Sequence, residues 1–330
     1  MKRDRVFVIA EAGVNHNGSL ASAIGLVDAA VEAGADAVKF QTFSADRLVL
    51  KTAQKAEYQK ATTGAGETQY EMLKRLELSK DDHLALAEHC RRRGIMFLST
   101  AFDCEGVRYL DSLGIPIFKI PSGEITNLPY LRAVAACGKP MILSTGMSTM
   151  DEVRDAVVAL GEGRDITLLH CTTEYPCPLA SVNLKAMVTM RDEFGLFVGY
   201  SDHTIGIEVP IAAVAMGVRV IEKHFTLDRN QDGPDHKASL EPDELASMIA
   251  AIRNVEAALG NGIKTPDAVE QKNIAVARKS IVARVPIRKG ELFTEANLTV
   301  KRPGMGLSPM LWDKVVGSVA NRDYVADENI

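Results

Sequence analysis

The sequence has few aromatic residues, few cysteines and no long apolar segment. Of its 330 residues, 5% are aromatic and five are cysteines, and no two cysteines have C-x-x-C spacing. This spacing excludes a zinc knuckle and a disulfide framework, and it favours reduced thiols in a cytoplasmic protein. The first apolar run, Val6 to Ala10, ends at Glu11 and is too short for a signal peptide. No run approaches the length of a membrane span, so we expect no contact with a membrane.

The charge balance excludes further partners. Lys and Arg total 38, Asp and Glu total 43, and the formal net charge is -5. A mildly acidic protein does not attract nucleic acid by bulk electrostatics, so we expect no nucleic-acid partner. The sequence has neither a P-loop nor a dinucleotide fingerprint, so neither ATP nor NAD is implied. Any anionic substrate must therefore be bound by locally placed lysines and arginines.

What is present is a repeated pattern. A short apolar run ends in polar residues and is followed by a helical stretch, eight times before about residue 260. Continuous apolar runs indicate parallel strands buried on both faces. Eight such units predict an α/β fold, a (β/α)8 TIM barrel over residues 1–262, and they favour closure over a doubly wound open sheet. The predicted strands are Val6–Glu11, Ala37–Thr42, Ile95–Thr100, Ile117–Ser122, Met141–Thr145, Ile166–Cys171, Leu196–Asp202 and Val218–Phe225.

Two parts of the chain depart from this rhythm. Residues 44–68 are polar and predict a long loop over the barrel mouth. Residues 263–279 predict one linker helix, and the short strand-like pieces of residues 280–330 predict a second, small, β-rich domain. Because about 50 residues is marginal for independent folding, we expect this domain to dock on another surface.

Two histidines stand at the ends of predicted strands seven and eight. In barrels of this class the active site lies at the C-terminal ends of the strands. Neighbouring parallel strands lie about 4.8 Å apart, so inward imidazoles of His203 and His224 could share one divalent metal. Two hydrogen-bonded polar histidines are the alternative. With few other ligands at hand, a loosely held Mn, Co or Mg-type ion fits better than structural zinc.

Lys39 and Lys119 lie within apolar strands, where a lysine without a partner is costly. They could form ion pairs with Glu11, Glu124 or Glu222, they could hold a phosphate or carboxylate, or one could form a Schiff base. We favour the anion site, because several donors converge on the same mouth. The hydroxyl donors at these strand ends include Thr100, Ser122, Ser144 and Ser201.

Glu11 and Glu124 are carboxylates at strand mouths. Each could be a general base, could hold sugar hydroxyls or could anchor an ion pair. The residues alone do not separate these roles.

The strand ends carry, in order, the motifs IAEAGVNHNGSL, AVKFQTF, FLSTAFD, KIPSGEITN, ILSTGM, LHCTTEYP, GYSDHT, VIEKHFTLD and GPDH. Their order resembles that of the sialic acid synthases, a family that includes the legionaminate and pseudaminate synthases. The segment SIVARVPIRKGELFTEANLTVKRPGMGLSP resembles the antifreeze-like (SAF) domain of that family. The resemblance covers essentially the whole chain.

The resemblance implies a cytoplasmic, metal-dependent transferase of carbohydrate biosynthesis. Its main reading is a sialic acid synthase that condenses phosphoenolpyruvate with open-chain N-acetylmannosamine and water, giving N-acetylneuraminate and phosphate by C–O cleavage. The alternative within the family is an N,N'-diacetyllegionaminate synthase that uses 2,4-diacetamido-2,4,6-trideoxymannose. A Schiff-base aldolase and a non-catalytic sugar-binding protein are the less favoured hypotheses.

The resemblance also implies roles for individual residues. His203 and His224 would bind the metal, typically Mn2+, with Co2+ or Mg2+ as alternatives. Glu124 would act near the attacking water, and Arg302 would reach the N-acetyl group held by the partner subunit of a domain-swapped homodimer. Some members carry asparagine at the position of Thr173, a further expected substrate contact. Phosphoenolpyruvate would contact Lys39, Thr100, Lys119, Ser122 and Ser201, and the sugar would contact Glu11, Gln41, Tyr175 and Asp235.

Overall fold

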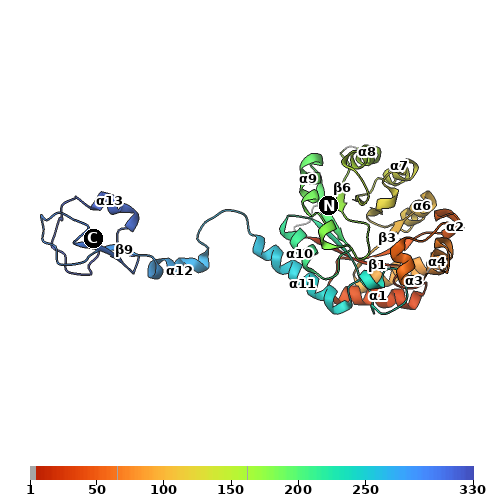
Figure 1. Cartoon of the computed structure of the whole chain (residues 1–330), viewed down its shortest axis with the longest axis horizontal. Helices are drawn as coiled ribbons and strands as arrows, with labels where there is room; N and C mark the ends of the chain where they lie inside the picture. Colours follow the sequence, from red (N-terminus) through yellow and green to blue (C-terminus); the bar gives the residue numbers. More distant parts are fainter. Residues whose placement is uncertain (1–4, 65, 162) are drawn as a thin grey trace. The chain divides into compact units, whose positions relative to one another are not determined.

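The computed structural model describes residues 5–64, 66–161 and 163–330. The chain forms two compact units, with the boundary between Gly260 and Asn261. Figure 1 shows the larger unit as a barrel of strands wrapped by helices and the smaller as a compact C-terminal body. Within those ranges, no helix combines the length and the apolar content that a bilayer crossing requires.

The larger unit is a closed barrel of eight parallel strands in chain order, and the TIM-barrel prediction is confirmed. Each strand pairs with its neighbour in sequence, and β1 pairs with β8 to close the ring. The strands are β1 (Phe7–Gly13), β2 (Ala37–Thr42), β3 (Met96–Ala101), β4 (Phe118–Ile120), β5 (Met141–Ser144), β6 (Ile166–His170), β7 (Phe197–Asp202) and β8 (Val220–His224).

Helices between the strands form the outer layer, and several begin at side-chain caps. The Ser19 hydroxyl accepts from the Ser22 amide at the start of α1, and Thr149 forms a capping box with Glu152 at the start of α8. Such caps satisfy amide groups that a helix cannot pair internally. The outer helices are α1 (Leu20–Glu32), α5 (Lys80–Arg93), α6 (Cys104–Ser112), α7 (Leu128–Ala136), α8 (Met150–Leu160), α9 (Lys185–Phe194), α10 (Glu208–Ala215) and α11 (Pro242–Leu259).

The segment predicted as a long loop, residues 44–68, is more ordered than the sequence suggests. It contains α2 (Ala45–Leu48) and α3 (Glu57–Thr63), and α4 (Gln69–Leu76) follows at once. The buried Lys55 ties the segment together, because its Nζ donates to Thr63 Oγ1 at 2.9 Å and to Glu67 Oε1 at 3.1 Å. The expectation of a plain loop is therefore wrong for α2 and α3.

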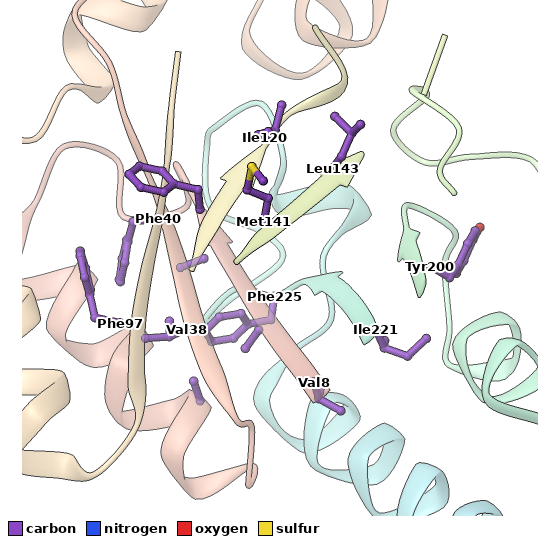
Figure 2. Packing of buried hydrophobic residues seen from close by; sticks show 14 of the residues in the cluster. Val8, Val38, Phe40, Phe97, Ile120, Met141, Leu143, Tyr200, Ile221 and Phe225 are labelled. Atoms are coloured by element: carbon purple, nitrogen blue, oxygen red, sulfur yellow. The ribbon is translucent and has the colours of Figure 1, made fainter. Parts of the chain in front are cut away.

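Alternation along the strands produces two apolar layers. Outward side chains such as Val8, Val38 and Ile221 pack under the helices, as Figure 2 shows. Inward side chains fill the lower barrel, among them Phe7, Ile9 and Ala37. Because side chains alternate with period two, the next inward residues after Ile9 and Ala37 are Glu11 and Lys39. The inward positions of the strands are therefore apolar in the lower barrel and charged at the C-terminal ends of the strands.

The smaller unit has its own apolar core. Helix α12 (Ala268–Ala277) is followed by the antiparallel pair β9 (Ser280–Ala283) and β10 (Leu298–Lys301), and by the short α13 (Trp312–Val315). The core includes Ile281, Ile287, Phe293, Leu298 and Tyr324. This antiparallel arrangement agrees with the predicted small β-rich domain.

Candidate active site

A cavity of about 380 Å³ opens at the C-terminal ends of the barrel strands. Apart from Ser201 and Arg302, every residue that the sequence nominated for the site lines this cavity. Those lining residues are Glu11, Lys39, Gln41, Thr100, Lys119, Ser122, Glu124, Thr173, Tyr175, His203, His224 and Asp235.

The register of the barrel brings these residues together. Glu11 is paired with Lys39 on one side and with His224 on the other. Thr100 is paired with Gln41 and with Lys119. Each is an inward position of its strand, so the polar ring follows directly from strand pairing.

Four buried charges form the floor of the cavity. Lys39 Nζ lies 2.8 Å from Glu11 Oε2 and 3.6 Å from Glu222 Oε2, and it donates to Thr100 Oγ1 at 3.0 Å. Lys119 Nζ, from the strand opposite β8, donates to Glu222 Oε1 at 3.1 Å. The two ammonium groups lie within ion-pair distance of the two carboxylates, as the burial of charged groups requires. Glu222, named in the sequence only as a possible ion-pair partner, is the hub of this group.

The two carboxylates differ in acidity. Burial, only partly offset by Lys39, raises the pKa of Glu11 to about 7. Burial acts in the same direction on Glu222, but Lys119 and Lys39 outweigh it and hold the pKa of that carboxyl well below its ordinary value. Glu222 is therefore the permanent anion of the group, and Glu11 is the carboxyl that can take up or release a proton near neutral pH.

His203 and His224 face each other across the ends of β7 and β8. Their ring centroids lie 5.5 Å apart with an interplanar angle of 62°. His203 Nδ1 lies 2.6 Å from the Thr172 carbonyl oxygen, which can only accept, so Nδ1 carries the proton and Nε2 keeps a lone pair. Burial lowers the pKa of both imidazoles, and His203 and Lys39 lower that of His224 further. Both rings are thus neutral and able to donate to a cation.

His203 and His224 are suited to a divalent ion, which their two imidazoles would bind. Buried His224 Nδ1 has no hydrogen-bond partner in the structure, and the nearest carboxylate, Asp235 Oδ2, is 4.0 Å away. A carbonyl fixing the orientation of a ligating histidine is the usual arrangement around bound metals. Among the described residues, no three His, Cys, Asp or Glu side chains are placed to hold an ion together. Two imidazoles alone leave positions for water and substrate.

Gly13 lies where three of these groups meet. A Cβ at this residue would lie 3.4 Å from Glu11 Oε1 and 3.5 Å from both Gln41 Nε2 and His224 Cε1. The backbone there has φ +52°, which favours glycine. The end of β1 thus brings Glu11, Gln41 and His224 around one point in the cavity.

A cluster of hydroxyl groups lies in the part of the cavity lined by the ends of β5 and β6. Ser122 Oγ accepts from the Gly146 amide at 2.9 Å and lies 3.2 Å from Cys171 Sγ. The hydroxyls of Ser144 and Thr173 are buried without a hydrogen-bond partner in the structure. Unsatisfied buried donors in the same cavity as Lys119 are what an oxyanion site needs before its ligand arrives. Ser144 belongs with the predicted anion-binding residues.

Aromatic rings cover the histidines. The Tyr175 ring lies 4.1 Å from that of His203, and Tyr58 of α3 lies 5.0 Å from Tyr175. Tyr58 was not predicted, because it lies in the segment expected to be a plain loop.

Two further carboxyl groups of the cavity are weaker acids than usual. Burial raises the pKa of Asp235 to about 6 and also raises the pKa of Glu124, whose carboxylate accepts a hydrogen bond from Asn127.

Two nominated residues lie elsewhere. Ser201 is buried behind the cavity lining, and its hydroxyl donates to Glu222 Oε1 at 2.9 Å. In this structure it contacts the charged floor and supports Glu222. Arg302 is an exposed residue of the smaller unit and immediately follows β10.

Comparison with known proteins identifies the family. Residues 26–264 match the NeuB family and residues 278–330 match the SAF domain. N,N'-diacetyllegionaminic acid synthase of Campylobacter jejuni is 52% identical over 99% of both chains. The enzyme of that name from Legionella pneumophila is 52% identical over 94% of this chain and 89% of its own.

A solved structure gives the same result. The N-acetylneuraminic acid (sialic acid) synthetase of Leptospira borgpetersenii, in complex with citrate, superposes with a TM-score of 0.73 at 36% identity. The match covers 82% of this chain and 90% of that one. The predicted resemblance is confirmed: the chain belongs to the NeuB family of sialic and legionaminic acid synthases, with a barrel followed by an SAF domain.

Proposed function

We propose that this protein condenses phosphoenolpyruvate with 2,4-diacetamido-2,4,6-trideoxymannose and water, giving N,N'-diacetyllegionaminate and phosphate. The observation that carries the proposal is the two-lysine, two-carboxylate floor lying beside two neutral histidines in one cavity. The floor suits a phosphorylated carboxylic acid, and the histidine side suits an aldehyde oxygen held near a cation.

The sugar is chosen by similarity. Two legionaminic acid synthases are 52% identical to this chain, whereas the neuraminic acid synthetase of known structure is 36% identical. N-acetylmannosamine, which the sequence analysis gave as the main substrate, is therefore the less favoured of the two family substrates.

Phosphoenolpyruvate would lie over Lys39 and Lys119. The free hydroxyls of Ser144 and Thr173, together with Thr100 and Ser122, would hold its phosphate and carboxylate. Burying a multiply charged anion beside Glu11 raises the pKa of that carboxyl further. Glu11 would then take up a proton on binding, which keeps the buried charge balanced.

The sugar aldehyde would lie on the histidine side. A divalent cation, Mn2+ or else Co2+ or Mg2+, would be held by His203 and His224, and when bound it supplies Lewis-acid polarisation of a carbonyl oxygen. Gln41, Tyr175 and Asp235 would orient the sugar so that its C1 faces C3 of phosphoenolpyruvate. Alignment of the two reacting carbons supplies much of the rate.

The bonds then change in two steps. C3 of phosphoenolpyruvate attacks the aldehyde carbon, and protonated Glu11 can give its proton to the developing alkoxide. Water adds to the cationic C2, and Glu124 accepts one of its protons. The C2–O bond to phosphate then breaks, the C2 hydroxyl becomes the ketone, and its proton leaves with the phosphate. The raised pKa of Glu124 makes it a better proton acceptor than an exposed carboxylate.

We also propose that the active form is a domain-swapped homodimer, in which Arg302 of one copy contacts the sugar acetyl group held by the other. This proposal rests on the family motif around KRPG. It would give the small SAF domain a role in the site.

Phosphate release tests the function. Phosphate should appear only when phosphoenolpyruvate, the diacetamido sugar and a divalent cation are all present, and 18O from water should enter the ketone rather than the phosphate. Phosphate release without the sugar, or activity unaffected by a chelator, would contradict the proposal. Trapping of substrate on Lys39 or Lys119 by borohydride would instead support the Schiff-base aldolase, and sugar binding without turnover would support a binding protein.

A further inference from the structure

One wall of the cavity differs in chemistry from the rest. The strand ends contribute charges, hydroxyls and imidazoles, whereas residues 43–76 contribute mainly apolar side chains. We call this side the apolar wall. It consists of Phe43, Leu48, Val49, Met72, Leu73 and Leu76, joined by Val14 just after β1 and Phe102 just after β3.

The apolar wall is a packed structure. Phe43, Met72 and Leu76 form a separate buried cluster with Val14. The rings of Phe43 and Phe102 meet edge to face with their centroids 6.1 Å apart. Thr62 Oγ1 donates to the Pro234 carbonyl at 3.4 Å, which joins the same segment to the loop after β8. The wall is therefore preformed before substrate binds.

Among the described side chains of this segment, none that lines the cavity is charged. Most of its cations are paired with carboxylates instead: Arg47 Nε lies 2.9 Å from Asp103 Oδ2, and Lys74 Nζ lies 3.1 Å from Asp46 Oδ2. Lys51 Nζ lies 5.7 Å from the centroid of the Tyr70 ring. Of the residues that the structure describes, Lys39 and Lys119 are the lysines that line the cavity, and the proposed function assigns both to phosphoenolpyruvate. A second phosphate on the sugar would thus face no counter-ion at this wall.

Gln69 places one adaptable polar group within the wall. It is the first residue of α4 and lines the cavity, and its side chain makes no hydrogen bond among the described residues. Gln59, the other glutamine from this segment in the lining, is already engaged, because its amide accepts from Ala56 N at 3.0 Å and donates to Tyr58 Oη at 3.3 Å. A free primary amide has one acceptor and two donors, which complements an acetamido group.

We infer that the apolar wall and Gln69 select the sugar by its C4–C6 end. Gln69 pairs with the acetamido group at C4, and Leu73 and its apolar neighbours cover the methyl groups of C6 and of that acetamido group. The inference rests on the proposed function, which fixes the aldehyde end at the histidines and leaves C4–C6 to extend toward the wall. The selected class is a neutral 4-acylamino-6-deoxy sugar. A hydroxyl at C6 would be buried against the apolar side chains without a partner, and a 6-phosphate would be rejected.

The test compares three sugars in the full-length, metal-loaded protein: the diacetamido sugar, N-acetylmannosamine and N-acetylmannosamine 6-phosphate. Gln69→Leu should lower kcat/KM for the diacetamido sugar by about 10- to 100-fold and for N-acetylmannosamine by less than about threefold. Gln54→Leu is the matched control, because Gln54 is exposed and does not line the cavity, and its kcat/KM should equal that of the parent.

Leu73→Asn tests the apolar side at a half-buried position that should tolerate the change. It should narrow the preference for the diacetamido sugar over N-acetylmannosamine by about tenfold, because the C6 hydroxyl gains a partner. Unchanged sugar ratios in both variants, with the parent active, would overturn this inference alone. A parent inactive with all three sugars would instead overturn the proposed function.

Discussion

Lys223 and Asp202 form a fully buried ion pair directly behind the two histidines of the cavity. Both side chains have 0% exposure, and Lys223 Nζ donates to Asp202 Oδ2 and to the Thr204 carbonyl. The two residues are register partners on β7 and β8, and each immediately precedes one of the histidines. Because side chains alternate along a strand, the pair faces the helices while the histidines face the cavity. The pair thus joins the ends of the two strands that carry the histidines.

Removing one member of this pair should destabilise the barrel strongly. Lys223→Met leaves the Asp202 carboxylate buried without its cation, so we expect the free energy of unfolding to fall by about 3–5 kcal/mol. Urea denaturation followed by circular dichroism measures this. Arg91→Met is the control: its pair with Glu88 is exposed on both sides, and its loss should change stability by less than about 1 kcal/mol. Equal effects of the two substitutions would show that the buried pair has no special role.

Removing a proposed metal ligand should weaken cation binding without unfolding the protein. We expect His203→Ala to weaken Mn2+ binding, measured by calorimetric titration, by more than about 100-fold, with phosphate release lost in parallel. Dialysis against a chelator should abolish activity in the parent, and added Mn2+ should restore it. His89→Ala serves as control, because His89 pairs with Asp28 outside the cavity. Unchanged Mn2+ affinity in His203→Ala would remove the two-histidine site.

Acid stability should depend on His16, a histidine outside the catalytic proposal. Burial, together with nearby His83 and His236, lowers its pKa to about 4, although Asp82 acts in the opposite direction. Its Nδ1 accepts from the Gly18 amide at 2.9 Å, which requires the neutral ring. A lowered folded-state pKa stabilises the fold above pH 6.5, and this contribution is lost as pH falls from 6.5 toward 4.

The His16 contribution should reach about 3 kcal/mol across that window. The free energy of unfolding of the parent should therefore fall between pH 7 and pH 4 by about 3 kcal/mol more than that of His16→Gln. The comparison needs urea unfolding curves for both proteins at several pH values. Parallel pH profiles for variant and parent would contradict the assignment.

The sequence predicts most of the barrel and its ring of polar residues because both follow from local periodicity. Strand parity alone places Glu11, Lys39, Lys119 and His224 on inward positions. It does not reveal which charges meet, because that depends on closure of the ring. The Lys119–Glu222 pair links β4 to β8 across the barrel. The spacing of residues along the chain does not predict this contact, because the two strands are distant in sequence and are not neighbours in the sheet.

The cavity wall formed by residues 43–76 could not be predicted from the sequence for a similar reason. Its short helices are fixed by distant contacts, such as Tyr58 against Tyr175 and Thr62 against Pro234. Gly and polar residues in this segment are typical of a loop, and they conceal the apolar residues that face the cavity. A capping box at Thr68 and Glu71, and the helical spacing of Met72 and Leu76, are the local signals of α4.

The proposed contribution of Arg302 can be tested by mixing two variants that are each impaired by a different defect. Arg302→Ala should fold like the parent, because the side chain is exposed, but it should raise KM for the sugar. Glu124→Gln should lower kcat through a defect in the barrel. If Arg302 acts on a second copy, a dimer of the two variants contains one site with both defects and one with neither.

Co-refolded or co-expressed equimolar variants should therefore recover about a quarter of the parental activity, because half of the dimers are mixed and each has one intact site. If Arg302 serves its own barrel, every site in the mixture carries a defect and no activity returns. Analytical ultracentrifugation of the same sample must show dimers for the comparison to hold. A dimeric mixture with only the summed residual activities of the two variants would exclude a contact between copies.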